Sequence, residues 1–144
     1  MTTVAWDGSS LAADRLVTEN GARVGYVDKV RRTSDNRLLA GSGSVASMKV
    51  LMNWVEDGGD RPNPWPEDAE VMEVLPNGRV RCHEKGGVVD MDPGPQVLGS
   101  GGRFAQAAMA CGKTAQEAVS IAILFDVYSG GDVVSVDHGA IDVR

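Results

Sequence analysis

The sequence predicts an α+β fold in which two antiparallel sheets stack face to face and helices cover their outer faces, a four-layer αββα sandwich. Short extended runs come in clusters separated by hairpin turns, helical segments fall between these clusters, and strand and helix do not alternate regularly. A length of 144 residues suits one domain, residues 1–144, and is too short for two independent cores.

The first forty residues are predicted to form hairpins. Asp7-Gly8 is a strong hairpin turn between two extended runs, and Asn20-Gly21 is a turn before a further pair of strand pieces. A third turn, Ser34-Asp35-Asn36, precedes the next strand. The predicted strands are 3–6, 11–14, two pieces within 23–32, and 37–40.

Apolar residues at helical spacing predict the first helix, which Ser44 caps and Asp57-Gly58 ends. Its buried face consists of Val45, Met48, Leu51, Met52 and Val55. Two more helices follow, one over 103–111 and one that starts at the capping box 114–117 and runs to about residue 128. The remaining predicted strands are 69–75, 78–82, 87–91, 96–98 and 132–136.

Composition excludes several function classes. A net charge of −6 argues against a nucleic-acid or anionic-membrane surface. No apolar run is long enough to span a membrane, and no basic segment followed by an apolar one opens the chain, so we expect a cytoplasmic protein.

Cys82 and Cys111 are too few and too distant for a disulfide framework or a zinc site, and we expect two small buried thiols. His83 and His138 lack a neighbouring nucleophile motif, which favours surface or strand roles.

Three glycine-serine segments, 41–44, 99–102 and 129–131, lie at predicted boundaries between strand and helix. Glycine there allows backbone N–H groups to face a ligand as an oxyanion or phosphate nest, and the alternative is three ordinary tight turns. None has the spacing of a phosphate loop or of a nucleophile elbow.

The N-terminus offers a nucleophile. Met1 precedes the small residue Thr2, a context in which the initiator methionine is usually removed. The exposed α-amine of Thr2 would have a pKa of about 7.7–8.0 and could act as base for its own hydroxyl. A start of this kind is common, so its meaning depends on the residues that follow.

Segments spread over most of the chain resemble, in order, those of proteasome β-subunits and of HslV, members of the N-terminal-nucleophile (Ntn) hydrolases. The last of these segments contains the pattern D-x-x-S-G, which begins at Asp126. The matching segments are 2–4, 11–18, 27–32, 40–44, 97–108 and 126–131. The resemblance implies the Ntn-hydrolase fold and a threonine peptidase.

The resemblance also implies a role for each matching position. Thr2 would be the nucleophile and its α-amine the general base once Met1 is removed. Asp14 would pair with Lys29, although from the residues alone these two could be an ordinary surface pair. The other implied catalytic positions are the backbone N–H of Gly43, an oxyanion donor, and Ser100, Asp126 and Ser129, which would hold the amine and a water.

Further residues are implied for substrate and metal. Val17 and Thr18 would border the substrate, and Val17, Val27 and Gly41 would line the first specificity pocket, which the glycine leaves roomy for an apolar residue. No cofactor is required, but members of this family can hold a sodium ion on main-chain carbonyls, which here would belong to Ile123, Asp126 and Ser129.

The sequence departs from the family in two places. The first hairpin is about four residues shorter, two per strand, and an even deletion keeps Asp14 on the same face. The stretch 58–67 contains Pro62, Pro64 and Pro66 and cannot be helical, where the family has a second long helix. We expect a homo-oligomeric ring, while the usual double ring and docking to an ATP-dependent unfoldase are left open.

The sequence is compatible with three functions. The first is a self-assembling threonine endopeptidase that acts on peptides or unfolded proteins. The second is a non-catalytic, proteasome-like assembly protein that retains Met1. The third is an Ntn amidase that acts on a small amide. Removal of Met1 and the activity of Thr2 separate the first from the second.

Overall fold

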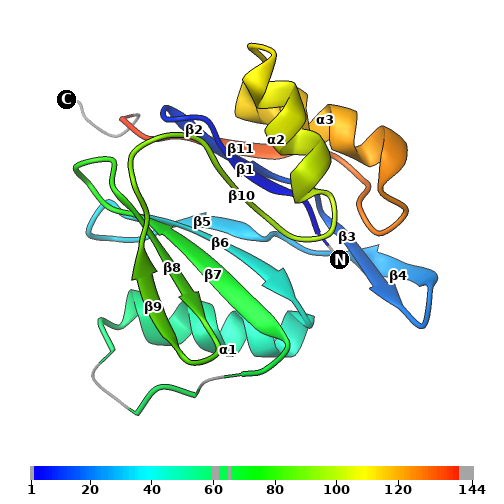
Figure 1. Cartoon of the computed structure of the whole chain (residues 1–144). Coiled ribbons are helices and arrows are strands. Elements are labelled where there is room, and N and C mark those ends of the chain that lie inside the picture. The colour runs from blue at the N-terminus through cyan, green and yellow to red at the C-terminus, as the bar shows by residue number, and fades with distance from the viewer. Residues whose placement is uncertain (1, 60–61, 65, 140–144) are drawn as a thin grey trace.

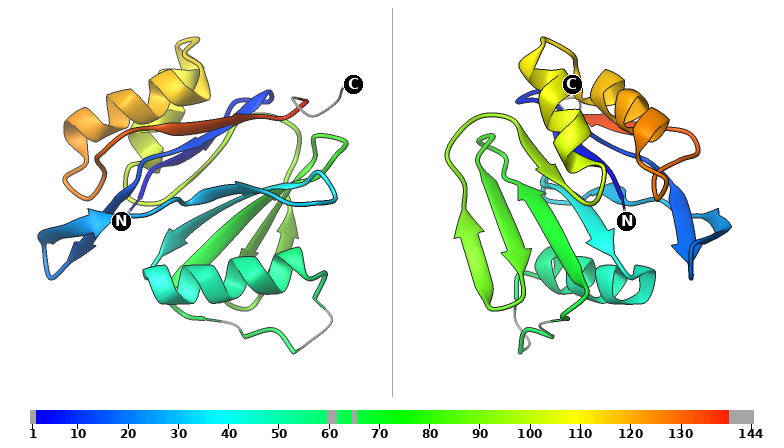
Figure 2. Two further views of the ribbon diagram at one scale, coloured as in Figure 1. Left: turned by 180° about the vertical axis from the view of Figure 1, so that it is seen from behind. Right: turned by 45° about the vertical axis from the view of Figure 1, so that its right-hand side comes forward.

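The computed structural model describes residues 2–59, 62–64 and 66–139, and its elements form four layers (Figure 1). One helix covers the outer face of a five-stranded sheet, a four-stranded sheet stacks on its inner face, and two helices cover the far side, as two further views show (Figure 2). The predicted αββα sandwich is confirmed. The elements are β1 (Val4–Trp6), β2 (Ser10–Ala13), β3 (Leu16–Glu19), β4 (Ala22–Tyr26), β5 (Val30–Arg32), β6 (Leu38–Gly43), α1 (Val45–Glu56), β7 (Ala69–Val74), β8 (Val80–Glu84), β9 (Gly87–Asp90), β10 (Gln96–Leu98), α2 (Gly102–Ala110), α3 (Ala115–Phe125) and β11 (Val134–Asp137).

The four-stranded sheet has the order β10-β1-β2-β11, with every pair antiparallel. The Asp7 carboxylate closes the β1–β2 turn by accepting hydrogen bonds from the backbone N–H groups of Ser9 and Ser10, each at 2.8 Å. Its other oxygen accepts a bond from the N–H of Ala115 at 2.8 Å, which ties this hairpin to the start of α3. β1 is therefore an inner strand, and Thr2 lies two residues before it.

The five-stranded sheet is an antiparallel meander with the order β5-β6-β7-β8-β9. The predicted turn between β7 and β8 is present, and the N–H of Gly78 donates to the carbonyl of Leu75 at 2.8 Å. The strand expected to end at Ala40 continues to Gly43, so Gly41 and Ser42 belong to β6 and not to a turn. Pairing with β7 extends this strand, because the ladder continues to the pair Gly43–Ala69.

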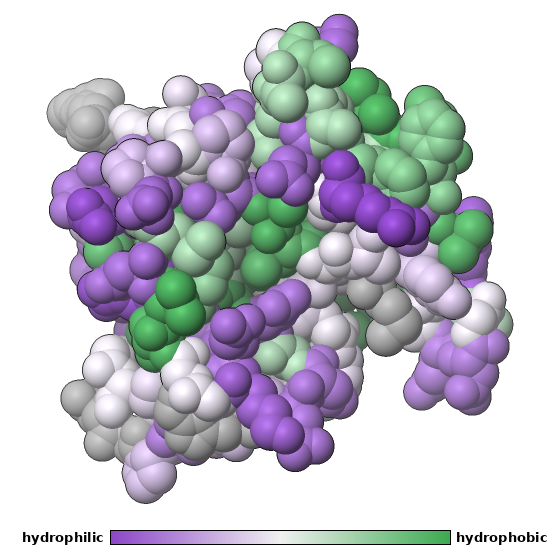
Figure 3. Space-filling view, in the orientation of Figure 1, coloured by the Kyte–Doolittle hydropathy of each residue, from purple (hydrophilic) through white to green (hydrophobic). Residues whose placement is uncertain are grey.

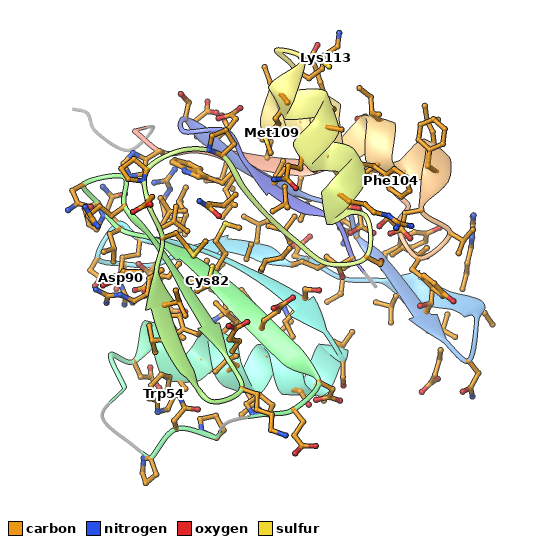
Figure 4. The ribbon with its side chains drawn as sticks, in the orientation of Figure 1. Trp54, Cys82, Asp90, Phe104, Met109 and Lys113 are labelled. Atoms are coloured by element: carbon orange, nitrogen blue, oxygen red, sulfur yellow. The ribbon has the colours of Figure 1, made fainter. Side chains whose placement is uncertain are left out.

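Alternation along β1 buries both faces of the four-stranded sheet. Val4 and Trp6 point between the sheets and pack against Leu38 and Met72 of the second sheet. Ala5 points the other way, where small side chains let α2 and α3 approach closely. These small residues are Ala12, Ala105, Ala108, Ala115, Ala118 and Ala122. Figure 4 shows Phe104 and Met109 extending from α2, with Lys113 at the loop between α2 and α3.

Strands β3 and β4 form a separate two-stranded sheet that projects from the sandwich (Figure 2). The sequence predicted strand within 23–32 but none at β3. The turn between them, Asn20-Gly21, has positive φ at both residues, +51° and +80°, which is the backbone that a tight two-residue hairpin requires. Val24 and Tyr26 of β4 are each 56% exposed, so at least one face of this hairpin is exposed to solvent.

The last helix begins as predicted and ends early. Thr114 and Glu117 form the expected capping box, with the hydroxyl of Thr114 accepting from the N–H of Glu117. The helix stops at Phe125, about three residues before the predicted end. The cause is Asp126, whose carboxylate accepts bonds from the N–H of Tyr128 and the hydroxyl of Ser129 and thereby stabilises a turn.

The outer face of the five-stranded sheet carries a network of polar and charged side chains beside α1. Arg37 donates to the carbonyls of Val55 and Glu56, at 2.9 and 2.8 Å, and so caps the C-terminus of α1. It also donates to Glu73 at 2.8 Å, and the other oxygen of Glu73 lies 2.8 Å from Nε2 of His83. We call Arg37, Glu73 and His83 the outer-face network. His83 is thus a buried strand residue.

The cysteines, the lengths of the helices and His138 were also the subject of expectations from the sequence. Cys82 is half-buried, but Cys111 is exposed, contrary to the expected pair of buried thiols, because it lies where the chain leaves α2. None of the described helices is both long and apolar enough to cross a membrane. His138 lies beyond β11 and its ring nitrogen Nε2 is 2.9 Å from the carbonyl oxygen of Leu75.

Candidate active site

The turn 99–102 packs directly against Thr2 and Thr3. The N–H of Gly101 donates to the carbonyl of Thr2 at 3.0 Å. A Cβ at Gly99 would lie 2.0 Å from that carbonyl oxygen, and one at Gly101 would lie 1.8 Å from Oγ1 of Thr3. Gly99 also has a φ of +88°. Glycine is therefore needed because the turn approaches the N-terminal strand more closely than any side chain allows.

Lys29 joins the hydroxyl of Thr2 to a buried carboxylate. Its ammonium nitrogen Nζ lies 3.1 Å from Oγ1 of Thr2, 2.9 Å from Oδ1 of Asp14 and 2.8 Å from the carbonyl oxygen of Leu16. The side chain of Lys29 is 3% exposed and that of Asp14 is fully buried. Asp14 and Lys29 are therefore not the ordinary surface pair that the residues alone allowed.

Asp14 is held by the backbone as well as by Lys29. Oδ1 accepts from the N–H of Thr3 at 3.0 Å, and Oδ2 accepts from the N–H groups of Leu16 and Gly130 at 3.2 and 2.9 Å. The carboxylate thus accepts from three backbone N–H groups and from the ammonium group of Lys29. It also fixes the relative positions of the N-terminal strand, β3 and the turn after α3.

The three oxygen neighbours of Lys29 Nζ match the three donors of an ammonium group. Burial lowers the pKa of Lys29 below its ordinary value, and the attraction of Asp14, with a smaller one from Asp126, opposes this shift. The charged form would stabilise an alkoxide at Thr2. A neutral amine would give its two donors to Asp14 and Leu16 and turn its lone pair to the Thr2 hydroxyl. Both forms make that hydroxyl easier to deprotonate.

A second chain of contacts runs from the nitrogen of Thr2. This nitrogen donates to Oγ of Ser100 at 3.1 Å, and Ser100 donates to Oδ2 of Asp126 at 2.7 Å. Ser129 donates to the same oxygen at 2.5 Å. Asp126 is 7% exposed, and its carboxylate accepts hydrogen bonds from two hydroxyl groups, one of which also accepts from the nitrogen of Thr2. The structure thus joins Thr2, Ser100, Asp126 and Ser129 in one hydrogen-bonded group.

Thr3 also belongs to this group, and the sequence prediction missed it. Its Oγ1 lies 2.7 Å from Oγ of Ser129. Because Ser129 gives its single proton to Asp126, Thr3 is the donor in this pair. Thr3 is fully buried, as are the apolar residues of β1 after it. A polar residue at the start of an apolar strand was the signal that could have identified it.

A cleft of about 470 Å³ opens between the β3–β4 hairpin and the start of α1, with Thr2 and Lys29 in its wall. We call it the hairpin cleft. Val17 and Thr18 line it, together with Glu19 of the same strand. Its other lining residues are Leu16, Asn20, Gly21, Val24, Gly43, Ser44, Val45, Ala46 and Met48. A volume of this size accommodates several side chains of an extended peptide.

Val27 and Gly41 do not line the hairpin cleft. A Cβ at Gly41 would lie 2.2 Å from Cγ and 2.7 Å from Sδ of Met48. Met48 of α1 therefore occupies the space that the glycine leaves, and the expected roominess from Gly41 is wrong. The apolar surface that reaches the cleft at this point belongs to Met48 itself.

A second cleft, of about 510 Å³, lies on the other side of Gly43. We call it the acidic cleft, because four of its lining residues are acidic and one is basic. They are Glu67, Asp68, Glu70, Glu84 and Lys85, and the remaining lining residues are Ser42, Gly43, Ala69, Gly99 and Ser100. Gly43 thus belongs to both clefts, and Ser100 joins the acidic cleft to the group around Thr2.

Gly43 sits at a position where other residues do not fit. Its φ is +112°, and a Cβ there would lie 2.0 Å from the carbonyl oxygen of Asp68. The next N–H, that of Ser44, donates to this same carbonyl at 2.9 Å. The backbone at Gly43 is therefore held at the boundary of the two clefts by pairing with the start of β7.

The sodium site suggested for the end of α3 stays a prediction. Of its three carbonyls, that of Asp126 accepts a hydrogen bond from the N–H of Ser129 at 3.2 Å, which leaves one lone pair for an ion. Main-chain carbonyls are suitable donors for a hard cation. Within residues 2–59, 62–64 and 66–139, no group of three or more His, Cys, Asp or Glu side chains could hold a metal.

Comparisons with known proteins show the family and the fold. No protein-family model matches the chain. The ATP-dependent protease subunits HslV of Lacticaseibacillus casei and Lacticaseibacillus paracasei are each 30% identical to it over 170 residues, which cover 93% of the chain and 98% of the relative. The chain belongs to the HslV family. Since the alignment is longer than the 144 residues of the chain, this member is shortened by internal gaps.

Solved structures support the same fold. The eukaryotic HslV from Trypanosoma brucei superimposes with a TM-score of 0.72 at 24% identity, covering 94% of this chain and 97% of that one. BPH from Thiobacillus denitrificans, in complex with epoxomicin, gives a TM-score of 0.73 at 20% identity with the same two coverages. Both are Ntn-hydrolase relatives in fold, and the resemblance that the sequence predicted is confirmed.

Proposed function

We propose that the protein is a threonine peptidase in which Thr2 is the nucleophile and its α-amine the general base. The observation that carries the proposal is the position of Thr2 between two separate groups. Lys29 reaches its hydroxyl at 3.1 Å, and Ser100 accepts from its nitrogen at 3.1 Å. A nucleophile needs an activated hydroxyl and a base within hydrogen-bond reach; Lys29 would activate the hydroxyl, and the α-amine freed by removal of Met1 would be the base.

The reaction runs in two halves. The hydroxyl oxygen of Thr2 attacks the scissile carbonyl while its proton passes to the neutral α-amine, directly or through a water. The tetrahedral oxyanion is stabilised by the N–H of Gly43 at the boundary of the clefts. Collapse breaks the C–N bond, the α-ammonium returns the proton to the leaving amine, and an ester to Thr2 remains. A water then attacks this ester by the same steps and releases the acid.

The supporting residues keep both groups of Thr2 ready for these steps. Lys29, held by Asp14, stabilises negative charge on the hydroxyl oxygen of Thr2. Ser100 orients the amine through its bond to Asp126. Ser129 shares that carboxylate and completes the group. The mechanism requires that Met1 be absent, because an amide nitrogen at Thr2 has no basic lone pair.

Substrate, assembly and metal follow as further parts of the proposal. The hairpin cleft would hold a peptide or an unfolded segment with Val17 and Thr18 beside it. We propose a homo-oligomeric ring, and the relatives' description as subunits of an ATP-dependent protease supports an ATP-driven unfoldase as partner. A sodium ion on the carbonyls of Ile123, Asp126 and Ser129 would stabilise the turn after α3 without taking part in the chemistry.

The experiment pairs intact mass with peptide hydrolysis. The purified chain should lack Met1, cleave short fluorogenic peptides and gain the mass of a threonine-directed covalent inhibitor. Thr2→Ala should lose both cleavage and labelling, and Thr2→Ser should keep part of each. Full activity in Thr2→Ala would refute the proposal. A chain that retains Met1, neither cleaves nor labels, and still assembles would instead be the non-catalytic assembly protein, and turnover of small amides alone would indicate the amidase.

A further inference from the structure

The acidic cleft contains two carboxylates that face each other across neighbouring strands. In the ladder of β7 and β8, Val71 pairs with His83, so the next position outward sets Glu70 opposite Glu84. The alternation of side chains puts both on the inner face of the sheet, the same face as Met72 and Cys82. Figure 3 shows hydrophilic side chains gathered at the lower centre, over these ends of β7 and β8.

Neither carboxylate forms an ion pair with a basic side chain of the described residues. The one basic residue that lines the cleft, Lys85, pairs with Glu67 at 2.8 Å. No ion pair or hydrogen bond joins Glu70 or Glu84 to another residue in the described part of the chain. Like charges directly opposite on adjacent strands are destabilising. Burial raises the pKa of Glu70 and the charge of Glu84 raises it further, while the attraction of the N-terminal ammonium group opposes these two effects.

The chemistry of Thr2 determines which part of a substrate enters this cleft. The α-amine must return its proton to the leaving amine, so the leaving amine has to lie within hydrogen-bond reach of the nitrogen of Thr2. That nitrogen faces Ser100, which lines the acidic cleft and not the hairpin cleft. Thr2 and Lys29 line the hairpin cleft, and Lys29 contacts the hydroxyl of Thr2. The acyl part of the substrate therefore lies in the hairpin cleft and the leaving part in the acidic cleft.

We propose that Glu70 and Glu84 are specificity-determining residues that select a lysine or arginine side chain on the leaving-group side of the scissile bond. A substrate cation placed between them relieves their repulsion, and the cleft volume of about 510 Å³ has room for such a side chain. This inference rests on the proposed function, because it assigns the two clefts from the route of the proton.

The test uses two kinds of substrate. An acyl-side probe carries a fluorogenic amine directly after the scissile carbonyl and leaves the acidic cleft without a peptide residue. A set of quenched peptides shares that acyl sequence and places lysine, norleucine or glutamate at the first or second leaving-group position. Lysine should give a kcat/KM about fivefold to tenfold above norleucine, and glutamate a lower value than norleucine. The preference should shrink as salt is raised.

Variants separate the carboxylates from the general charge of the protein. Glu70→Gln and Glu84→Gln should each reduce the lysine preference, measured as the ratio of the two kcat/KM values within one variant, to within about twofold of norleucine. Asp92→Asn removes the same charge at an exposed turn outside the cleft and should keep the preference. Glu70→Gln should also raise the midpoint of thermal unfolding, because it removes the repulsion, and this measurement does not depend on activity.

The outcomes distinguish the two proposals. If the acyl-side probe is cleaved but lysine and norleucine are equivalent, or if Glu70→Gln keeps the full preference, the role of the acidic cleft is refuted and the peptidase stands. If a lysine preference survives in both Glu variants, another surface carries it and the inference is wrong. If the wild-type chain without Met1 cleaves no substrate of either kind, both proposals fail together.

Discussion

Replacement of Asp14 by asparagine tests the buried pair on which the site depends. Asp14→Asn keeps the shape of the side chain and removes its charge, so Lys29 would remain buried without a counter-ion. The amide also brings two N–H donors to a position where four donors already converge. At least one donor must then face another donor.

The size of the effect follows from burial. The side chains of Lys29 and Asp14 are 3% and 0% exposed. Removal of one partner of a buried pair costs about 3–5 kcal/mol, because an uncompensated charge is left behind. A domain of this size has a free energy of unfolding of about 5–15 kcal/mol. Asp14→Asn should therefore lower the thermal midpoint by roughly 10 °C.

Lys29→Met should cost much less, which makes the pair of variants informative. Asp14 would lose one donor and keep the N–H groups of Thr3, Leu16 and Gly130. A carboxylate with three backbone donors stays satisfied, and the burial of the ammonium group is avoided, so we expect a cost below about 2 kcal/mol. Both variants should lose peptide cleavage, since neither keeps a cation fixed beside Thr2.

Urea unfolding of the two single variants and the double variant measures these values. Asp14→Asn combined with Lys29→Met should be more stable than Asp14→Asn alone, because the unpaired ammonium is gone. Equal costs for the two single variants would refute the reasoning that the backbone donors hold Asp14. A cost of Asp14→Asn below about 1 kcal/mol would show that the pair is not buried as described.

Three further predictions concern positions around the site. Gly43→Ala should lower stability by about 2 kcal/mol or more and abolish cleavage, since its Cβ would meet the carbonyl of Asp68 at 2.0 Å with φ at +112°; normal stability in urea unfolding would contradict this. Burial alone would raise the pKa of Glu73, but the hydrogen bonds of Glu73 to a histidine and an arginine outweigh burial and hold this pKa below 4.5. The carboxylate therefore contributes stability above pH 4.5, and this contribution is lost as the pH falls through the folded-state pKa. Glu73→Gln should flatten this part of a plot of unfolding free energy against pH. Burial raises the pKa of Cys82 to about 11, so at pH 8 a thiol reagent should react promptly with the exposed Cys111 alone, and Cys111→Ser should remove the fast phase.

Local patterns were sufficient for most of the fold. Helical spacing predicted α1 within one residue at its C-terminal end, Asp7-Gly8 predicted the first hairpin, and Asn20-Gly21 was predicted as a turn without the strand before it. β3 was missed because Leu16–Glu19 is too short for alternation to be visible. The early end of α3 was missed because the side chain of Asp126, and not helix propensity, decides it.

The site was predicted from resemblance and could not have been derived from spacing. Asp14 and Lys29 are fifteen residues apart and meet through a buried contact between the residue that follows β2 and the residue that precedes β5. Ser100 and Thr2 are 98 positions apart. Contacts of this range depend on how the sheets stack, which periodicity does not encode. The filling of Gly41 by Met48 was missed for the same reason, because it depends on how α1 lies over β6.

The outer-face network explains how this side of the sheet can do without the second long helix that the resemblance implies. Among the described residues between α1 and β7, none is helical. A helix on that side of the sheet would need an apolar face beneath it, yet β7, β8 and β9 present Glu73, Arg81, His83 and Asp90 there. Arg81 pairs with Asp90 at 2.8 Å, and Arg37 joins Glu73 to the carbonyls at the end of α1. The part of the outer surface that lies beside α1 thus carries ion pairs, so a ring made of this chain needs contacts that do not use a second helix there.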